Sequence, residues 1–182
     1  MAMISCTKIE REEIGLLSEW MASESAREFL ACDMQMSLAG QFRWIGERKG
    51  DPFTTHWIVR RDETPIGVLA IVDINLENKR CGWSYYMHDP ADDTDELSAL
   101  LERSIYHHVF MELGLNKVTF TAFTENHCAI GRRSESGCVQ EGVLVDHVLL
   151  GGKYYDVSLQ CMTAKMWRRA CPDGNCEFIK LR

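Results

Sequence analysis

The sequence predicts an α/β domain of the α+β type, in which a mixed central sheet of about six or seven strands is flanked by helices. Three observations predict this fold class. Apolar residues recur at helical spacing near the start and change to strand-like alternation after residue 55. Residues 97–113 then contain the apolar face of one long amphipathic helix. From residue 81 onward, strand and helix segments alternate, which implies a crossover connection on a mixed sheet.

In the first half, we expect two helices followed by an antiparallel meander. The helices are predicted over residues 12–21 and 38–47, where apolar side chains recur at helical spacing. Branched and aromatic residues then predict three strands, which are separated by polar turns at residues 62–65 and 75–79. These strands are expected at residues 56–60, 66–74 and 81–88.

In the second half, Asp89 and Pro90 close the third strand, and the long helix ends at Gly114. A strand, a second helix that stops at Gly137 and two final strands follow. They are predicted over residues 117–123, 126–135, 139–150 and 154–162. Because no repeat or low-complexity linker interrupts the pattern, we expect one domain over residues 1–167 and a C-terminal extension over residues 168–182.

The 182 residues carry a net charge of −7, with 20 Lys and Arg against 27 Asp and Glu. The length and the 46% hydrophobic content suit one globular domain with a sizeable core and exclude a disordered or fibrous chain. Because phosphate binding needs clustered basic residues, nucleic acid and anionic membranes are not expected partners. No apolar run is long enough to cross a bilayer, and the expected location is the cytoplasm.

The sequence has eight cysteines, and six of them are scattered singly, as expected of buried free thiols. Cys171 and Cys176 flank a turn near the end of the sequence, where they either close a small disulfide or belong to a plain loop. The short paired spacings of zinc sites are absent, so no metal site is expected.

Three stretches of the sequence carry a family resemblance. They are Pro65-Ile66-Gly67-Val68-Leu69, the block over residues 125–144, and the closing Gly152-Lys153-Tyr154-Tyr155-Asp156-Val157. In this order they resemble the GNAT superfamily of N-acyltransferases, over residues 9–167. The likeness is to its branch for ribosomal-protein alanine and amino sugars, above all to the acetyltransferases of UDP-linked amino sugars in pseudaminic acid biosynthesis. It implies a GNAT fold and acetyl-CoA as the cofactor.

The resemblance places the family's signature for the CoA diphosphate, Gln/Arg-x-x-Gly-x-Gly/Ala, on residues 93–98. Here Asp93, Glu96 and Ser98 replace the basic or amide residue and the two glycines. Asp93 and Glu96 also have the spacing of a capping box. We therefore expect carboxylates to fill the diphosphate cradle at the start of the long helix.

The resemblance also assigns the pantetheine arm of CoA to the central strand. The backbone of Tyr85, Tyr86, Met87 and His88 is expected to pair with the amides of the arm. Asn126 matches a family position that contacts this arm or orders the active-site water, and it is equally a candidate helix cap.

Acyl transfer to an amine needs a base, and His88 and Asp73 are the candidates because each lies near the end of a strand of the meander. A solvent-facing His88 and a turn-forming Asp73 are the alternatives. Arg133 falls where the family often has a tyrosine acid. Its charge suits a thiolate or a phosphate, and an exposed helix arginine is the alternative. The candidate residues of the acceptor pocket are Trp20, Trp44, Asn75 and Trp83. For the three tryptophans, packing in the core is the alternative.

Together, these features predict an N-acyltransferase that moves an acetyl group from acetyl-CoA to a primary amine of a small molecule. A nucleotide-linked amino sugar is the candidate acceptor. The alternative is a divergent GNAT domain without CoA-dependent catalysis, which serves as a binding or scaffolding module and forms a homodimer through its final strands. A third possibility keeps acyl transfer but uses another donor, such as a carrier-protein thioester.

Overall fold

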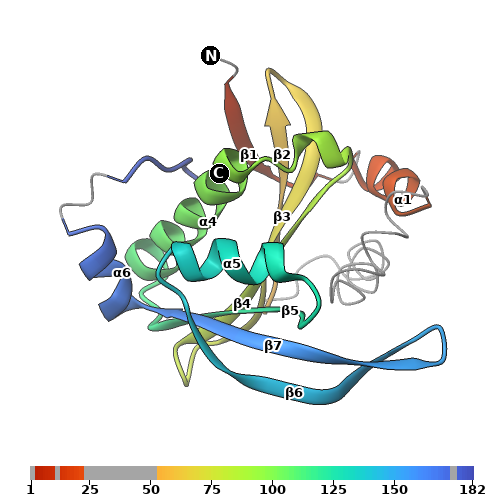
Figure 1. Cartoon of the computed structure of the whole chain (residues 1–182). Coiled ribbons are helices and arrows are strands. Elements are labelled where there is room, and N and C mark those ends of the chain that lie inside the picture. The colour runs from red at the N-terminus through yellow and green to blue at the C-terminus, as the bar shows by residue number, and fades with distance from the viewer. Residues whose placement is uncertain (1–2, 11–12, 23–52, 173–175) are drawn as a thin grey trace. The chain divides into compact units, whose positions relative to one another are not determined.

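The computed structural model describes residues 3–10, 13–22, 53–172 and 176–182 (Figure 1). The chain divides into two compact units. The first unit comprises Met1–Ile9, Asp51–Thr119 and Met162–Arg182, and the second comprises Glu10–Gly50 and Phe120–Cys161. The helix predicted over residues 38–47 lies outside the described residues.

Seven strands form one mixed sheet in the order β1-β2-β3-β4-β5-β7-β6, which confirms the predicted fold class. Strands β1 to β4 pair antiparallel, β4 pairs parallel with β5, and β6 pairs antiparallel with β7. The sequence pattern misses β1, because its partner β2 is distant along the chain. The strands are β1 Ile4–Lys8, β2 Thr55–Arg61, β3 Thr64–Asn75, β4 Arg80–Met87, β5 Lys117–Phe123, β6 Val139–Leu150 and β7 Lys153–Thr163.

The helices are α1 Ile14–Ala22, α4 Asp95–His107, α5 His127–Glu135 and α6 Ala164–Ala170, with a 3₁₀ turn η2 at Pro90–Asp92 and a π-helical segment η3 at His108–Glu112. The predicted long helix is therefore α4 continued by η3, and Gly114, with φ 64°, follows its end. The sequence pattern does not predict α6. Its N-cap is Thr163, whose Oγ1 accepts a hydrogen bond from Met166 N at 3.3 Å.

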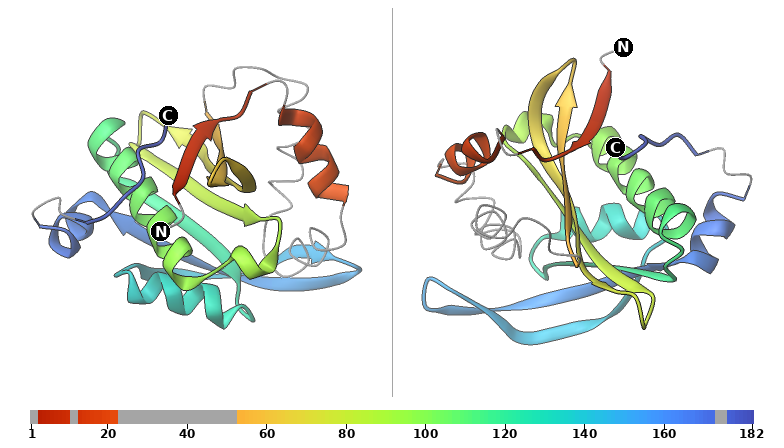
Figure 2. Two further views of the ribbon diagram at one scale, coloured as in Figure 1. Left: turned by 90° about the horizontal axis from the view of Figure 1, so that it is seen from above. Right: turned by 180° about the vertical axis from the view of Figure 1, so that it is seen from behind.

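In the first unit, one face of α4 packs against the meander of β1 to β4 (Figure 2). Leu97, Leu101 and Ile105 recur at helical spacing on this face, and none is more than 6% exposed. Tyr106 of α4 meets Trp83 of β4 with ring centroids 6.4 Å apart. Because burial of each large apolar side chain contributes about 1.5–3 kcal/mol, this face fixes α4 beside β4.

Strand β3 contains two special positions. Gly67 lies so close to β4 that a Cβ there would be 2.3 Å from the carbonyl oxygen of Tyr86, so this approach requires glycine, as the sequence indicates. Further along β3, the register with β4 shifts between Val72 and Asn75, and Asp73 has φ 51°. This β-bulge takes Asp73 out of the regular alternation of the strand.

The end of the chain returns to β1. Leu181 forms a parallel bridge with Cys6, and Lys8 N donates a hydrogen bond to Arg182 O at 2.7 Å (Figure 2). Part of the segment predicted as an extension, residues 168–182, therefore lies along the outer side of β1.

The cysteines are mostly buried, as expected, but not uniformly. A disulfide joins Cys171 to Cys176, which decides between the two alternatives that the sequence leaves open. The expectation of burial is wrong for Cys128, because this residue lies on an exposed side of α5. Among the described residues, the buried cysteines outside this disulfide are Cys6, Cys81, Cys138 and Cys161. Burial raises the pKa of two of them, Cys6 and Cys81, to about 12.

Candidate active site

The segment between β4 and α4 is held by its own hydrogen bonds. Asp89 Oδ1 accepts a hydrogen bond from Ala91 N at 2.9 Å and caps η2. The next three N–H groups also donate within the segment: Asp92 N to Asp89 O at 2.9 Å, Asp93 N to Pro90 O at 3.1 Å and Thr94 N to Asp92 O at 2.9 Å. The backbone donors of residues 91–94 are therefore already used.

The N-cap of α4 is Thr94. Its Oγ1 accepts a hydrogen bond from Leu97 N at 3.2 Å, and its carbonyl oxygen accepts one from Ser98 N at 2.9 Å. The capping box predicted to start at Asp93 is therefore wrong by one residue. The cap shifts by one residue because the Asp93 carboxylate is turned toward β4, where it accepts a hydrogen bond from Tyr85.

Tyr85 connects β4 to the start of α4. Its hydroxyl donates a hydrogen bond to Asp93 Oδ1 at 2.8 Å and lies 3.1 Å from Ser98 Oγ. Because the single hydroxyl proton of Tyr85 points to the carboxylate, Ser98 acts as the donor in the second contact. Next to it, Asp92 forms an ion pair with Arg61 of β2. Carboxylates from this segment are thus part of its local structure.

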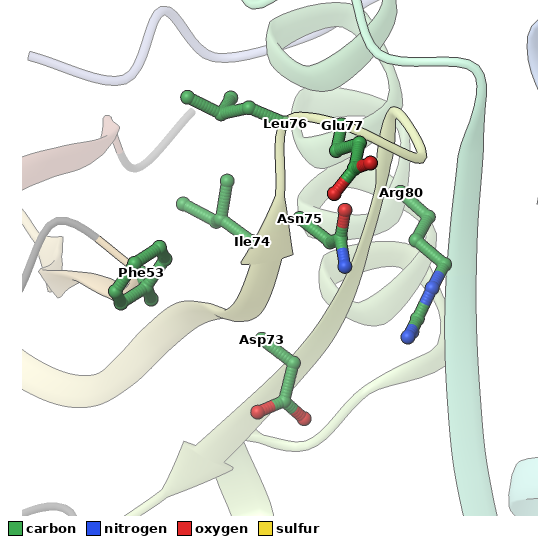
Figure 3. Close-up of a pocket in the computed structure, with 7 residues that line it drawn as sticks. All are labelled: Phe53, Asp73, Ile74, Asn75, Leu76, Glu77 and Arg80. Atoms are coloured by element: carbon green, nitrogen blue, oxygen red, sulfur yellow. The ribbon is translucent and has the colours of Figure 1, made fainter.

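Around the β3–β4 turn, at the opposite end of β4, the first unit has an open pocket of about 700 Å³ (Figure 3). The pocket brings together Asp73 and Asn75, two residues that the sequence predicts for the site. The pattern misses Glu77, which lies in the turn, and Arg80, the first residue of β4. The lining residues are Phe53, Asp73, Ile74, Asn75, Leu76, Glu77 and Arg80.

The polar residues of this pocket keep hydrogen-bonding capacity for a ligand. Asn75 Oδ1 accepts a hydrogen bond from Asn78 N at 2.7 Å, so the amide nitrogen of Asn75 remains as a donor. Asp73, Glu77 and Arg80 are exposed, and among the described residues no hydrogen bond or ion pair involves their side chains. Two acids, a guanidinium and an amide therefore share one cavity.

Comparisons with known proteins bear on the fold. No protein-family model and no curated protein matches the chain. Solved structures do match: a chimera of the spermidine N-acetyltransferase SpeG from Vibrio cholerae and hSSAT is 17% identical, with a TM-score of 0.76 over 91% of this chain and 98% of that chain. The chain has the GNAT fold.

Two further structures of SpeG from Vibrio cholerae agree. A mutant form of the spermidine/spermine N-acetyltransferase is 17% identical, with a TM-score of 0.74 over 91% of this chain and 96% of that chain. A dodecameric structure in an intermediate state is 18% identical, with a TM-score of 0.70 over 90% of this chain and 95% of that chain. At this identity the likeness establishes the GNAT fold and no particular branch.

The GNAT fold implies acetyl-CoA, so the start of α4 can be tested against its diphosphate. A diphosphate at a helix N-terminus needs free backbone N–H groups and little competing negative charge. Within residues 93–98, the N–H groups of Asp93, Thr94, Leu97 and Ser98 already donate inside the segment. This leaves at most those of Asp95 and Glu96, and Asp93, Asp95 and Glu96 add carboxylates. One carboxylate about 6 Å from a phosphate charge costs about 1–3 kcal/mol. Residues 93–98 therefore do not fit the diphosphate of CoA.

The central strand β4 fits the pantetheine arm better. β4 pairs with β3 along most of its length, whereas its ladder with β5 joins only Arg80–Gly82 to Lys117–Thr119 in the part of the chain that the structure describes. The backbone of residues 85–87 lies beyond that ladder, and His88 N donates to Ile66 O at 2.9 Å on the β3 side. Strand backbone outside a ladder can pair with an extended arm that contains amides.

The two candidate bases lie at different ends of β4. Asp73 is next to Val72, which pairs with Gly82 near the start of β4, whereas His88 follows its last residue. Because a strand rises about 3.3 Å per residue, the two side chains belong to positions roughly 20 Å apart. Asp73 therefore lies at the pocket, whereas the half-buried His88 lies near the start of α4.

Two candidate residues lie in the second unit. Asn126 is the N-cap of α5, with its Oδ1 accepting a hydrogen bond from Ala129 N at 3.0 Å, as the cap alternative predicts. Arg133 is only 1% exposed, and its guanidinium carbon lies 4.6 Å from the centroid of the Phe120 ring. The expectation of an exposed helix arginine is therefore wrong, because this side chain stacks inward on an aromatic ring.

The tryptophans predicted for an acceptor pocket belong to the core where the structure describes them. Trp20 and Trp83 are 5% and 3% exposed. Trp83 stacks on Tyr85 with ring centroids 5.9 Å apart. Trp44 lies outside the described residues. Core packing, the alternative given for these aromatics, accounts for Trp20 and Trp83.

The histidine pair at the end of α4 is packed against neighbours. The His107 ring stacks on Phe178 at 3.7 Å between centroids, and His108 Nδ1 lies 2.8 Å from Glu112 Oε2. Within the described residues, no three His, Cys, Asp or Glu side chains are grouped so that they could hold a metal ion. In the same residues, no helix combines the length and the apolar character needed to span a membrane.

Proposed function

We propose that this chain is an N-acyltransferase that transfers an acyl group from a thioester donor, acetyl-CoA, to the primary amine of a small molecule. The observation that carries the proposal is the combination of two features on one strand of a GNAT fold. Arg80 at the start of β4 lines a pocket together with the carboxylates of Asp73 and Glu77. The backbone of β4 beyond Gly82 lies outside the β5 ladder. The similar Vibrio cholerae structures are spermidine N-acetyltransferases, which supports an amine as the acceptor.

The pocket suits the chemistry of the acceptor. A primary amine is protonated near neutral pH and must lose a proton before it can attack an acyl carbon. The carboxylates of Asp73 and Glu77 bind the ammonium, and Asp73 accepts its proton directly or through one water. Asn75 donates a hydrogen bond to an oxygen of the acceptor. An amino sugar linked to a nucleotide carries both the amine and such oxygens, and it is the acceptor that we propose.

The donor is placed on the other half of β4, with its thioester end directed toward the pocket. Its pantetheine arm pairs with the backbone of residues 85–87, next to His88. The diphosphate stays outside the start of α4, because Asp93 and Glu96 bring negative charge there. His88 contacts the donor rather than the amine, since it lies roughly 20 Å along β4 from the pocket.

Calorimetric titration with acetyl-CoA, followed by an assay of CoA release with primary amines, tests the proposal. We expect Asp73→Asn to lower acyl transfer at least 100-fold, about the size of a lost general base, and to leave donor affinity unchanged. Asp62→Asn is the matched control, because Asp62 also has a positive φ, 47°, and lies outside the pocket. A chain that binds no acetyl-CoA and releases no CoA with any amine contradicts the proposal.

The closed start of α4 favours a second candidate function. In this alternative the GNAT domain binds an amine without CoA-dependent catalysis and serves as a binding or scaffolding module. The same titrations separate the two functions. Amine binding that depends on Asp73, together with a flat response to acetyl-CoA, supports the module and contradicts the acyltransferase.

We also propose that the chain pairs with a second copy through β6. This strand is the last in the sheet order, and its exposed apolar residues are Val139, Val143, Val145 and Leu149. Antiparallel pairing of β6 with itself makes a self-complementary interface. Light scattering should show a dimer that Val145→Lys dissociates, whereas Met111→Lys, at a similarly exposed residue of η3, should leave it intact.

A further inference from the structure

The pocket at the β3–β4 turn carries both signs of charge. The carboxylates of Asp73 and Glu77 and the guanidinium of Arg80 line it together. All three residues are exposed, and in the described part of the chain no ion pair joins Arg80 to either acid. The positive charge of Arg80 is therefore available to a ligand that also meets the acids.

Hydrogen-bond donors lie beside the acids in this pocket. Figure 3 shows the side chain of Arg80 running along β4, while Glu77 and Asn75 face each other within the turn. Because Asn78 N already binds Asn75 Oδ1 at 2.7 Å, Asn75 offers its amide N–H groups. Arg80 adds a planar fork of donors, the geometry that binds a phosphate or a carboxylate in a bidentate manner.

An apolar wall completes the pocket. Phe53 and Leu76 are 56% and 69% exposed, and Ile74 lies between them. Ile74 N donates a hydrogen bond to Phe53 O at 3.0 Å, which fixes the position of the aromatic residue beside β3. Such a wall suits the carbon skeleton of a small organic ligand rather than a hydrated ion.

We infer that the acceptor of this chain bears an anionic group, a phosphate or a carboxylate, close to its primary amine, and that Arg80 determines this specificity. The inference rests on the proposed function, because it names the acceptor of the same pocket. Asp73 and Glu77 bind the ammonium, and Arg80 binds the anion. A linear polyamine carries positive charges alone, so it has no group that pairs with Arg80. The spermidine acetyltransferases that share this fold therefore support the amine of the acceptor and give no guide to its anionic group.

Calorimetric titration with four small molecules tests the inference. Glucosamine 6-phosphate and glucosaminate combine an amine with a phosphate or a carboxylate, whereas glucosamine and spermidine lack the anion. We expect at least one of the first two to bind about threefold more tightly than both of the others, which is about the size of an exposed ion pair. Whichever of the two anionic amines binds more tightly identifies the anionic group, phosphate or carboxylate.

Two charge-removing variants locate the effect. Arg80→Gln should reduce the affinity for the anionic amine to that for glucosamine. Lys79→Gln removes the adjacent exposed positive charge, which does not line the pocket, and should leave the affinity unchanged. Equal melting temperatures of both variants and the wild type show that the fold is intact. Spermidine or glucosamine binding as tightly as the anionic amines, or an unchanged affinity in Arg80→Gln, overturns the inference.

An acetyl-transfer assay on the same samples distinguishes the inference from the proposed function. Binding of the anionic amine that depends on Arg80, without transfer from acetyl-CoA, contradicts the proposed function and supports anion recognition by Arg80. Acetyl transfer that is the same in the wild type and in Arg80→Gln supports the proposed function and overturns the inference.

Discussion

The hydroxyl of Tyr85 donates a 2.8 Å hydrogen bond to Asp93, and this contact ties the end of β4 to the segment that precedes α4. Tyr85 is 7% exposed and Asp93 is half-buried, so the bond is partly shielded from water. The acidic side chain at the start of α4 is therefore held by the body of the fold. Asp93, one of the carboxylates at the diphosphate seat that the family resemblance predicts, is thus fixed in place by the folded chain.

The closed cradle predicts that the diphosphate of CoA contributes little to binding. S-acetylpantetheine, which lacks the diphosphate and the nucleotide, should bind within about threefold of acetyl-CoA, because the part that it lacks has no seat at residues 93–98. Calorimetry with both compounds measures the difference. An affinity for acetyl-CoA that is 100-fold higher, about 2.7 kcal/mol, contradicts a closed cradle.

Restoring the family signature should open the cradle. The triple variant Asp93→Arg, Glu96→Gly, Ser98→Gly removes two carboxylates, and we expect its affinity for CoA to rise at least tenfold, about 1.4 kcal/mol. Its affinity for S-acetylpantetheine should stay constant, because that ligand carries no diphosphate. If neither affinity changes, the signature has been placed on the wrong residues.

Arg133 is predicted to stabilise the second unit. Replacement by alanine removes a buried guanidinium from the Phe120 ring and should lower the free energy of unfolding by about 2–4 kcal/mol. Arg132→Ala, at the more exposed neighbouring residue, should cost about 0.5 kcal/mol or less. Urea unfolding of both variants gives the comparison. Equal midpoints for the two variants would show that Arg133 has no structural role.

Stability should decline in alkaline solution because of two thiols. Burial holds the pKa of Cys6 and Cys81 at about 12, above the ordinary value of 9.0. The contribution of each thiol is therefore fully present below pH 9 and is lost as the pH rises from 9 toward 12, at about 1.4 kcal/mol per pH unit and thiol. Urea midpoints at several pH values measure this slope. Cys81→Ala should have a shallower slope than the wild type, and parallel slopes contradict the prediction.

The fold could be predicted from local periodicity, since the meander and the apolar face of α4 each repeat over neighbouring residues. The strand β1 could not, because its five residues pair with β2 across a distant part of the sequence. The N-cap of α4 also depends on a contact that the local sequence pattern does not contain. Asp93 and Thr94 are both good N-cap residues, and the choice between them is made by Tyr85 through a tertiary contact.

The candidate site was predictable in part for the same reason. Asp73 and Asn75 stand out because they are polar residues at the end of an apolar strand. Glu77 and Arg80 join them only through the geometry of the β3–β4 turn, which the sequence pattern does not specify. The burial of Arg133 depends on the position of Phe120, which no spacing within α5 indicates.

The path of the last residues along β1 limits how far this sheet can extend. Leu181 and Arg182 occupy the outer side of β1, whereas no described residue pairs with the outer side of β6. A sheet with one covered margin and one open margin can add a neighbouring molecule on a single side. In the proposed dimer the β6 margins of both copies are used, so no open margin of the described sheet is left for further edge-to-edge growth.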